Sequence, residues 1–181
     1  APDAGTAVGP PPDVSWTLGH ARYVNMANGA LHIVTGAFGF SGRYITRKLL
    51  DRGIRVQTLT NRPQSASPFG DRVRALPLCF DDPAALTEHL RGADVVYNTY
   101  WIRFARGDAT HRLAVDNTRT LMRCAVEAGV VRFVHISVSN PSEESVLSYF
   151  RGKAALERTL VESGLSYAIL RPRFCSGRAT S

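Results

Sequence analysis

The fold of this chain depends on the stretch Leu31-His32-Ile33-Val34-Thr35-Gly36-Ala37-Phe38-Gly39-Phe40-Ser41-Gly42. An apolar, β-branched run leads into three glycines with the spacing Gly-x-x-Gly-x-x-Gly, and apolar residues at helical spacing follow as far as Gly53. This order predicts a strand, a tight turn and the start of a helix. Glycines let the backbone approach a ligand closely, and the free N–H groups of a helix's first turn attract phosphate.

A second β-branched run, Arg55–Thr60, follows directly, so the glycine-rich stretch lies inside a β-α-β unit. That context favours a dinucleotide site over the structural alternative, an ordinary tight connection between a strand and a helix. No Gly-Lys-Ser/Thr follows the glycines, as a P-loop requires, and Ser41 lacks the Gly-x-Ser-x-Gly frame of a hydrolase nucleophile. We therefore expect a pyridine dinucleotide.

The 181 residues fit one globular domain, and the formal charge of +7 comes from basic residues spread along the chain. Because these residues form no run interleaved with aromatics, we expect no nucleic-acid partner and attribute the charge to attraction of an anionic ligand. Three cysteines without a CxxC pair indicate a reducing compartment, so we expect a cytoplasmic protein. The scattered histidines predict no metal site, and no apolar run is long enough for a membrane span.

Residues 1–29 differ in composition from the rest of the chain. They are rich in Pro and Gly and poor in core-forming residues, and they lack the basic and long apolar regions of a secretory signal. We expect a flexible or disordered leader without a role in the chemistry. The NAD(P)-binding domain is then expected over residues 30–181.

From Leu31 onward, strand-like and helix-like segments alternate. The expected strands are Leu31–Thr35, Arg55–Thr60, Val73–Cys79, Ala93–Thr99, Val130–Ser137 and Leu165–Pro172. The expected helices are Ser41–Arg52, Ala84–Leu90, Ala109–Ala128 and Tyr149–Ser163. This alternation predicts a single α/β domain with a Rossmann-type, doubly wound parallel sheet that binds ligands at the carboxyl ends of its strands.

The residues after the second strand select the nucleotide. An NAD site commonly carries Asp or Glu there, about 20 residues past the glycines, to bind the ribose 2′-hydroxyl. Here the position holds Asn61-Arg62, and the planar fork of an arginine suits a 2′-phosphate. The sequence thus favours NADP, with NAD still open and a solvated loop position as the alternative role of Arg62.

Tyr149 and Lys153 lie four residues apart on an expected helix, so their side chains share one face. An ammonium close to a tyrosine favours the phenolate, which suits Tyr149 to moving a proton at a carbonyl or an alcohol. The alternative is an amphipathic helix with a surface lysine. Ser137 and Ser139 follow the fifth strand, where a hydroxyl can bind a substrate oxygen or cap a turn.

Together these motifs resemble the short-chain dehydrogenase/reductase superfamily, in the form of its extended and atypical branches, the NAD(P)-dependent epimerase/dehydratase-like proteins. The resemblance covers about residues 31–177. The motifs that carry it are Thr35-Gly36-x-x-Gly39-x-x-Gly42, Asp81-Asp82, Val134-His135-Ile136-Ser137-x-Ser139, Tyr149-x-x-x-Lys153 and Leu170-Arg171-Pro172.

The resemblance implies a dehydrogenase/reductase or an epimerase/dehydratase that acts on a small-molecule carbonyl or alcohol. It implies Tyr149 as acid/base, Lys153 as its partner, Ser139 as the carbonyl-binding serine and Ser137 as a second candidate. The cofactor contacts that we expect are Gly36, Phe38, Gly39, Phe40, Gly42, Asn61, Arg62, Asp81, Asn98, Thr99, Lys153 and Pro172.

The family pattern also sets limits. Extended members commonly carry an asparagine on the helix after the fourth strand, and Asn117 is the nearest counterpart here. Members continue well beyond the Arg-Pro segment, so we expect this chain to be a fragment that lacks most of the substrate-binding part. A non-catalytic NADP(H)-binding sensor or accessory module stays open as an alternative, as does an isomerase or dehydratase that retains its cofactor. The resemblance also leaves a homodimer open.

Overall fold

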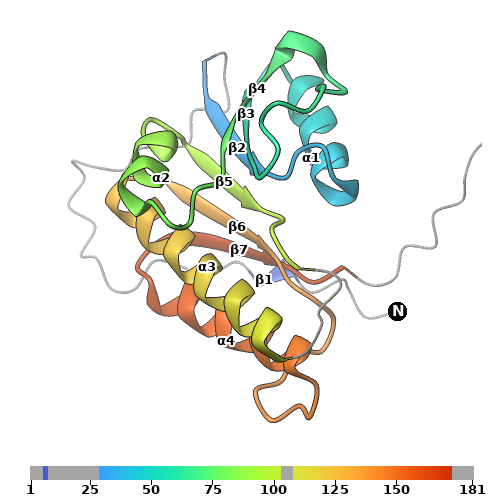
Figure 1. Ribbon diagram of the computed structural model, residues 1–181, viewed down its shortest axis with the longest axis vertical. Coiled ribbons are helices and arrows are strands. Elements are labelled where there is room, and N and C mark those ends of the chain that lie inside the picture. Colours follow the sequence, from blue (N-terminus) through green and yellow to red (C-terminus); the bar gives the residue numbers. More distant parts are fainter. Residues whose placement is uncertain (1–5, 8–28, 103–107, 173–181) are drawn as a thin grey trace, which may run out of the picture.

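A computed structural model of the chain describes residues 6–7, 29–102 and 108–172, which form an α/β fold (Figure 1). The described part holds a seven-stranded sheet in the order β1-β7-β6-β5-β2-β3-β4. Its strands are β1 (Thr6–Ala7), β2 (Leu31–Thr35), β3 (Arg55–Thr60), β4 (Val73–Pro77), β5 (Val95–Asn98), β6 (Arg132–Ile136) and β7 (Ser166–Leu170). Strands β2 to β7 are mutually parallel, and β1 is antiparallel to β7.

The described helices are α1 (Phe40–Leu50), α2 (Pro83–Leu90), α3 (Asp108–Glu127) and α4 (Ser148–Glu162), and a single 3-10 turn covers Gly70–Arg72. Both ends of each of the four α-helices lie within two residues of their expected positions. The predicted doubly wound parallel sheet is therefore confirmed. The strand expected over Val73–Cys79 ends at Pro77. The neighbouring strand β3 ends at Thr60, whose carbonyl accepts the Leu78 N–H at 3.0 Å, so Cys79 has no strand residue beside it to pair with.

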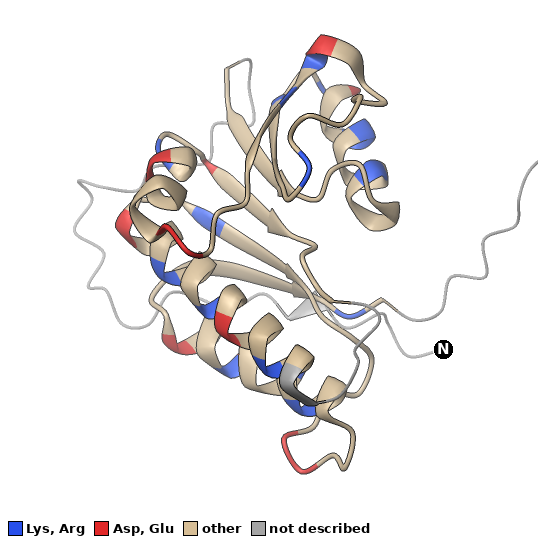
Figure 2. Cartoon of the chain, in the orientation of Figure 1, with Lys and Arg blue, Asp and Glu red and all other residues tan. Residues whose placement is uncertain are grey.

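Residues Thr6 and Ala7 of the expected leader form β1 and pair with Leu170 and Ile169. The rest of the leader, residues 1–5 and 8–28, lies outside the described residues, as do 103–107 and 173–181. Among described helices, none is long and apolar enough to cross a membrane. Figure 2 shows the basic residues distributed over helices and strands rather than gathered in one band.

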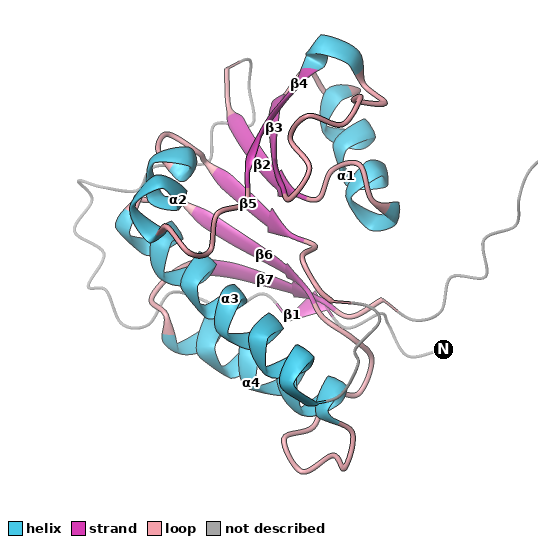
Figure 3. Cartoon of the chain, in the orientation of Figure 1, coloured by secondary structure: helices cyan, strands magenta, loops and turns pink. Residues whose placement is uncertain are grey.

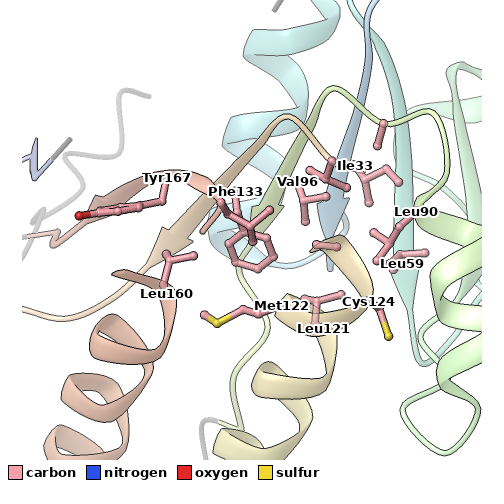
Figure 4. Close-up of a cluster of buried hydrophobic side chains, with 14 of the residues drawn as sticks. Ile33, Leu59, Leu90, Val96, Leu121, Met122, Cys124, Phe133, Leu160 and Tyr167 are labelled. Atoms are coloured by element: carbon pink, nitrogen blue, oxygen red, sulfur yellow. The ribbon is translucent and has the colours of Figure 1, made fainter. Parts of the chain in front are cut away.

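Two hydrophobic cores hold the helices against the sheet, and Figure 3 shows α1 apart from α2, α3 and α4. The larger core lies between the sheet and the helices α2, α3 and α4, with Phe133 and Leu121 wholly buried at its centre (Figure 4). The smaller core lies under α1, where Leu49 packs with Val34 and Val56. The helix α1, which follows β2, lies on one face of the sheet, and the helices that follow β4, β5 and β6 lie on the other. The chain therefore leaves β2 and its neighbour β5 toward opposite faces, and the carboxyl end of β2 stays open to a ligand.

Candidate functional site

A cavity of about 430 Å³ opens at the carboxyl ends of β2, β3 and β5. Its lining comes from the glycine-rich turn, the ends of the three strands and the loops that follow them. The lining residues are Gly36, Gly39, Phe40, Ser41, Gly42, Leu59, Thr60, Asn61, Arg62, Leu78, Thr99, Tyr100 and Trp101. Strand β2 pairs with β3 on one side and β5 on the other, so the cavity lies at the switch point of the sheet, where open α/β folds bind their ligands.

The glycine-rich turn is built around the carbonyl oxygen of Gly36. Gly36 has a φ of +69°, and its carbonyl accepts the Gly39 N–H at 2.9 Å. A Cβ on Gly42 would lie 2.2 Å from the same oxygen, so only glycine lets the first turn of α1 approach it. Gly39, at the N-cap, offers no side chain to the helix, and the first turn holds no acidic residue. The free N–H groups there suit a phosphate.

Thr35 ties the turn to the loop that follows β5. Its hydroxyl accepts the N–H groups of Thr99 at 2.9 Å and Tyr100 at 3.0 Å, and donates to Asn98 Oδ1 at 3.1 Å. The Thr99 hydroxyl also donates to the Thr35 carbonyl. These contacts hold Thr99 and Tyr100 against the cavity.

At the outer end of the cavity, Asn61 and Arg62 follow β3. The Arg62 N–H donates to the Thr60 hydroxyl at 3.2 Å, which bends the chain so that both residues line the cavity. The Arg62 guanidinium forms no ion pair with any other described residue. An unpaired guanidinium in this position can bind an anionic group of a ligand.

Lys153 lies under the loop that follows β5. It is 3 % exposed, and its Nζ donates to the Ile136 carbonyl at 2.8 Å. The same ammonium sits 4.3 Å from the centroid of the Trp101 ring. Burial lowers the pKa of Lys153 from 10.5 to about 7, although the nearby Glu157 opposes the shift.

Tyr149 belongs to an aromatic cluster at the start of α4. Its ring meets the Trp101 ring edge-on at 5.5 Å and the His111 ring at 5.9 Å. His111 also bonds Ser148 through Nδ1 at 2.6 Å. Tyr149 and Lys153 therefore both contact Trp101, and neither lines the cavity itself.

The two candidate serines differ in their surroundings. Ser139 donates to the Pro172 carbonyl at 3.0 Å, which joins the ends of β6 and β7. Ser137 is buried, and its hydroxyl has no hydrogen-bond partner within the described part of the chain. An unpaired buried hydroxyl is costly, so the two serines differ: the Ser139 hydroxyl is bonded and the Ser137 hydroxyl is not, within the described residues.

The structure brings seven of the expected cofactor residues together in the cavity lining: Gly36, Gly39, Phe40, Gly42, Asn61, Arg62 and Thr99. The other expected residues lie outside it: Phe38, Asp81, Asn98, Lys153, Pro172, Tyr149, Ser137 and Ser139. Asn98 is wholly buried and bonded to Thr35 and His135, so it supports the lining from below. Among the described residues no His, Cys, Asp and Glu side chains group as metal ligands.

Tyr100 and Trp101 line the cavity without having been singled out from the sequence. Their position directly after Asn98-Thr99, at the carboxyl end of a strand, is the signal that could have found them. The Tyr100 hydroxyl accepts from Asn117 Nδ2 at 2.9 Å, and its ring packs on Phe80 at 4.8 Å. Asn117, the nearest counterpart of the family's asparagine, thus holds Tyr100 in place.

The geometry agrees with a comparison with known families. Residues 36–180 match a protein family described as NAD(P)H-binding. The chain belongs to this NAD(P)H-binding family. The predicted NAD(P)-binding family with a Rossmann-type fold is thereby confirmed, and NAD(P) is confirmed as the class of cofactor.

Two relatives each match more than three quarters of the chain. A (4-alkanoyl-5-oxo-2,5-dihydrofuran-3-yl)methyl phosphate reductase from Streptomyces griseus is 31% identical over 144 residues, which cover 78% of this chain and 46% of the reductase. The photosystem II assembly factor Ycf39 from Cyanophora paradoxa is 26% identical over 140 residues, covering 77% of this chain and 44% of that protein. The chain thus spans less than half the length of these two relatives.

Solved structures share the fold at low identity. The Bordetella bronchiseptica enzyme WbmH in complex with NAD+ superposes with a TM-score of 0.65 at 20% identity, over 78% of this chain and 55% of WbmH. The Citrobacter triphenylmethane reductase complexed with NADP(H) gives a TM-score of 0.64 at 18% identity, over 80% of this chain and 50% of the reductase.

Proposed function

We propose that the chain is the cofactor-binding part of an NADP(H)-dependent oxidoreductase or epimerase-type enzyme. The observation that carries the proposal is the cavity at the switch point of the sheet, with an open helix N-terminus at its floor and Arg62 at its outer end. The pyrophosphate of the dinucleotide would bind the N–H groups of the first turn of α1. Arg62 would bind the 2′-phosphate, because no carboxylate follows β3 to accept a ribose hydroxyl.

The chemistry would take place beyond Trp101, where α4 approaches the ends of β5 and β6. When bound, the dinucleotide supplies or accepts a hydride. Tyr149 would exchange a proton with the substrate oxygen, and the unpaired hydroxyl of Ser137 would orient that oxygen. Lys153 would bind the nicotinamide ribose and support the charge on Tyr149. Ser139 is bonded to Pro172 and is the second serine in this scheme.

The test combines binding with turnover. Calorimetric titration with NADPH should show binding, and Tyr149→Phe should retain it, because Tyr149 lies outside the cavity lining. Turnover with a panel of carbonyl, sugar-nucleotide and quinone substrates should disappear in Tyr149→Phe, with Tyr44→Phe, an exposed tyrosine on α1, as the matched control. Failure of the wild-type chain to bind NADPH or NADH would refute the proposal.

A non-catalytic NADP(H)-binding module is the second candidate. The burial of Lys153 under Trp101 favours it, because a lysine in that position is not in contact with the cavity. This alternative predicts NADPH binding without turnover on any substrate, in the wild-type chain and in Tyr149→Phe alike.

A further inference from the structure

Trp101 faces the cavity on one side and the proposed catalytic lysine on the other. Trp101 is one of the residues that line the cavity, next to Tyr100, and its ring covers the Lys153 ammonium at 4.3 Å from the ring centroid. Lys153 is 3 % exposed in this arrangement. A ribose hydroxyl in the cavity therefore cannot reach Nζ while the indole keeps this position.

The resting position of the indole is shaped by its neighbours. A Cβ on Gly152 would lie 3.3 Å from Trp101 Cη2 and 2.9 Å from Val115 Cγ2, so the glycine leaves the space that the ring occupies. His111 stacks on the indole at 5.9 Å with an interplanar angle of 19°, and Tyr149 meets it edge-on. Aromatic contacts of this kind stabilise the ring beyond the burial of its apolar surface.

The same position leaves the indole N–H unsatisfied. Trp101 Nε1 is buried and has no hydrogen-bond partner in residues 29–102 or 108–172. A buried donor without a partner is costly, and this cost opposes the stabilisation that the ring gains from its neighbours. Trp101 is partly exposed, and its indole can leave without breaking a hydrogen bond to a described residue.

We propose that Trp101 is a positioning residue: its indole covers the Lys153 ammonium until the nicotinamide half of the dinucleotide enters the cavity, and this half displaces the ring and uncovers the lysine. The proposal rests on the function proposed above and specifies how the cofactor would reach Lys153. The adenine half, which would bind near Arg62 at the opposite end of the cavity, does not move the ring.

Displacement of the indole also changes the charge on the lysine. Hydration favours the ammonium form, so the pKa of Lys153 rises from about 7 toward its ordinary value once the ring departs. The charged or titratable groups that face Lys153 are Glu157, on its own helix, and His135, on β6. Both stay in place in this scheme. Binding of the nicotinamide half would thereby produce the cation that the ribose and Tyr149 require.

The chain is well suited to a direct test because it contains only two lysines, Lys48 and Lys153. In protein labelled with 13C-lysine, the ε-protons of Lys153 should show an upfield ring-current shift that those of Lys48 lack. Trp101→Leu should abolish that shift, and Leu113→Ala, an exposed position on α3, should not. Saturating NADP+ should abolish the shift in the wild-type protein, whereas saturating 2′,5′-ADP, which lacks the nicotinamide half, should leave it intact.

Acetylation by limiting acetic anhydride gives a second readout that does not depend on a ligand. Lys153 should react at least about tenfold faster in Trp101→Leu than in the wild type, because removal of the indole lets the reagent reach an amine that is 3 % exposed in the wild type, while Lys48 is unchanged.

An upfield shift that persists with NADP+ bound, or one that 2′,5′-ADP also removes, overturns the proposal. So does the absence of the shift in the free protein, or equal acetylation of Lys153 in the wild type and Trp101→Leu. If calorimetry shows that neither NADP+ nor 2′,5′-ADP binds, the proposed function fails first, and the ligand-driven step fails with it. If both bind and only the NMR response is missing, the function stands and the role of Trp101 alone is refuted.

Discussion

The side-chain amide of Asn98 donates to His135 Nδ1 at 3.1 Å, and this bond fixes the protonation state of a wholly buried histidine. Asn98 Oδ1 accepts the Tyr100 N–H at 3.1 Å and the Thr35 hydroxyl at 3.1 Å, so the NH2 group must face His135. His135 Nδ1 is therefore an acceptor and the ring is neutral, with its proton on Nε2. Burial and the nearby Lys153 both hold the pKa of His135 well below 6.5.

This arrangement predicts a loss of stability on mild acidification. Below about pH 6.5 the unfolded chain protonates His135 and the folded chain does not, so the free energy of unfolding falls by up to about 1.4 kcal/mol per pH unit. His135→Gln should show a smaller loss in urea unfolding between pH 7 and about pH 5.5. His32, whose pKa burial also lowers, contributes with the same sign in both proteins and cancels in the comparison. Identical pH dependence in the two proteins would contradict the assignment.

We expect Lys153 to lower the free energy of unfolding while it serves turnover. The unfolded lysine holds a proton up to its ordinary pKa and the folded one only to about 7, so this residue destabilises the chain at neutral pH and less so as the pH rises. Lys153→Met should raise the free energy of unfolding at pH 7 by about 1–4 kcal/mol and remove turnover. The difference in unfolding free energy between the two proteins should shrink from pH 7 to 9. An equal or lower stability of the variant would show that the lysine is not desolvated. Lys48→Met is the control.

Gly42 should tolerate no side chain. In Gly42→Ala the new Cβ would lie 2.2 Å from the Gly36 carbonyl oxygen, which is backbone and cannot rotate away. The variant should lose about 1–3 kcal/mol of stability and most of its NADPH affinity. Gly39→Ala, whose Cβ would lie 3.3 Å from the same oxygen, should lose less of both. Equal effects in thermal unfolding and titration would show that the close approach is not the cause.

Arg62 should select between the two nicotinamide cofactors. Arg62→Ala should weaken NADPH binding by about ten- to a hundredfold and leave NADH binding unchanged, since a hydrogen bond to a charged group contributes about 1.5–3 kcal/mol. Arg123→Ala, an exposed position on α3, is the matched control. An unchanged ratio of NADPH to NADH affinity in calorimetry would show that Arg62 is a solvated loop residue that does not bind the 2′-phosphate.

The order of elements was predictable because each step depends on local pattern. The β-branched run before Gly36 and the helical spacing after Gly42 define β2 and α1, and the Asp82-Pro83 pair defines the start of α2, where the Asp82 carboxylate accepts the Ala85 N–H at 3.0 Å. The glycines and Arg62 could be assigned to one cavity because parallel strands bring their carboxyl ends to one edge.

The contacts between distant segments were not predictable in this way. Asn98 was expected to touch the cofactor, yet it lies beneath the cavity and bonds residues that are 63 and 37 positions away. Asn117 bonds a tyrosine hydroxyl that no spacing rule connects with it. Such pairs depend on how strands and helices pack, and a side chain's partner across a sheet leaves no periodic trace in the sequence.

The sequence by itself determined the α/β fold, the dinucleotide turn and the candidate residues Tyr149 and Lys153, because strand and helix periodicity and glycine spacing are local properties of the chain. Only the tertiary structure placed Trp101 between the cavity and Lys153. That placement requires a loop after β5 and a helix more than 40 residues later to meet over a glycine, Gly152, whose missing side chain leaves room for the ring.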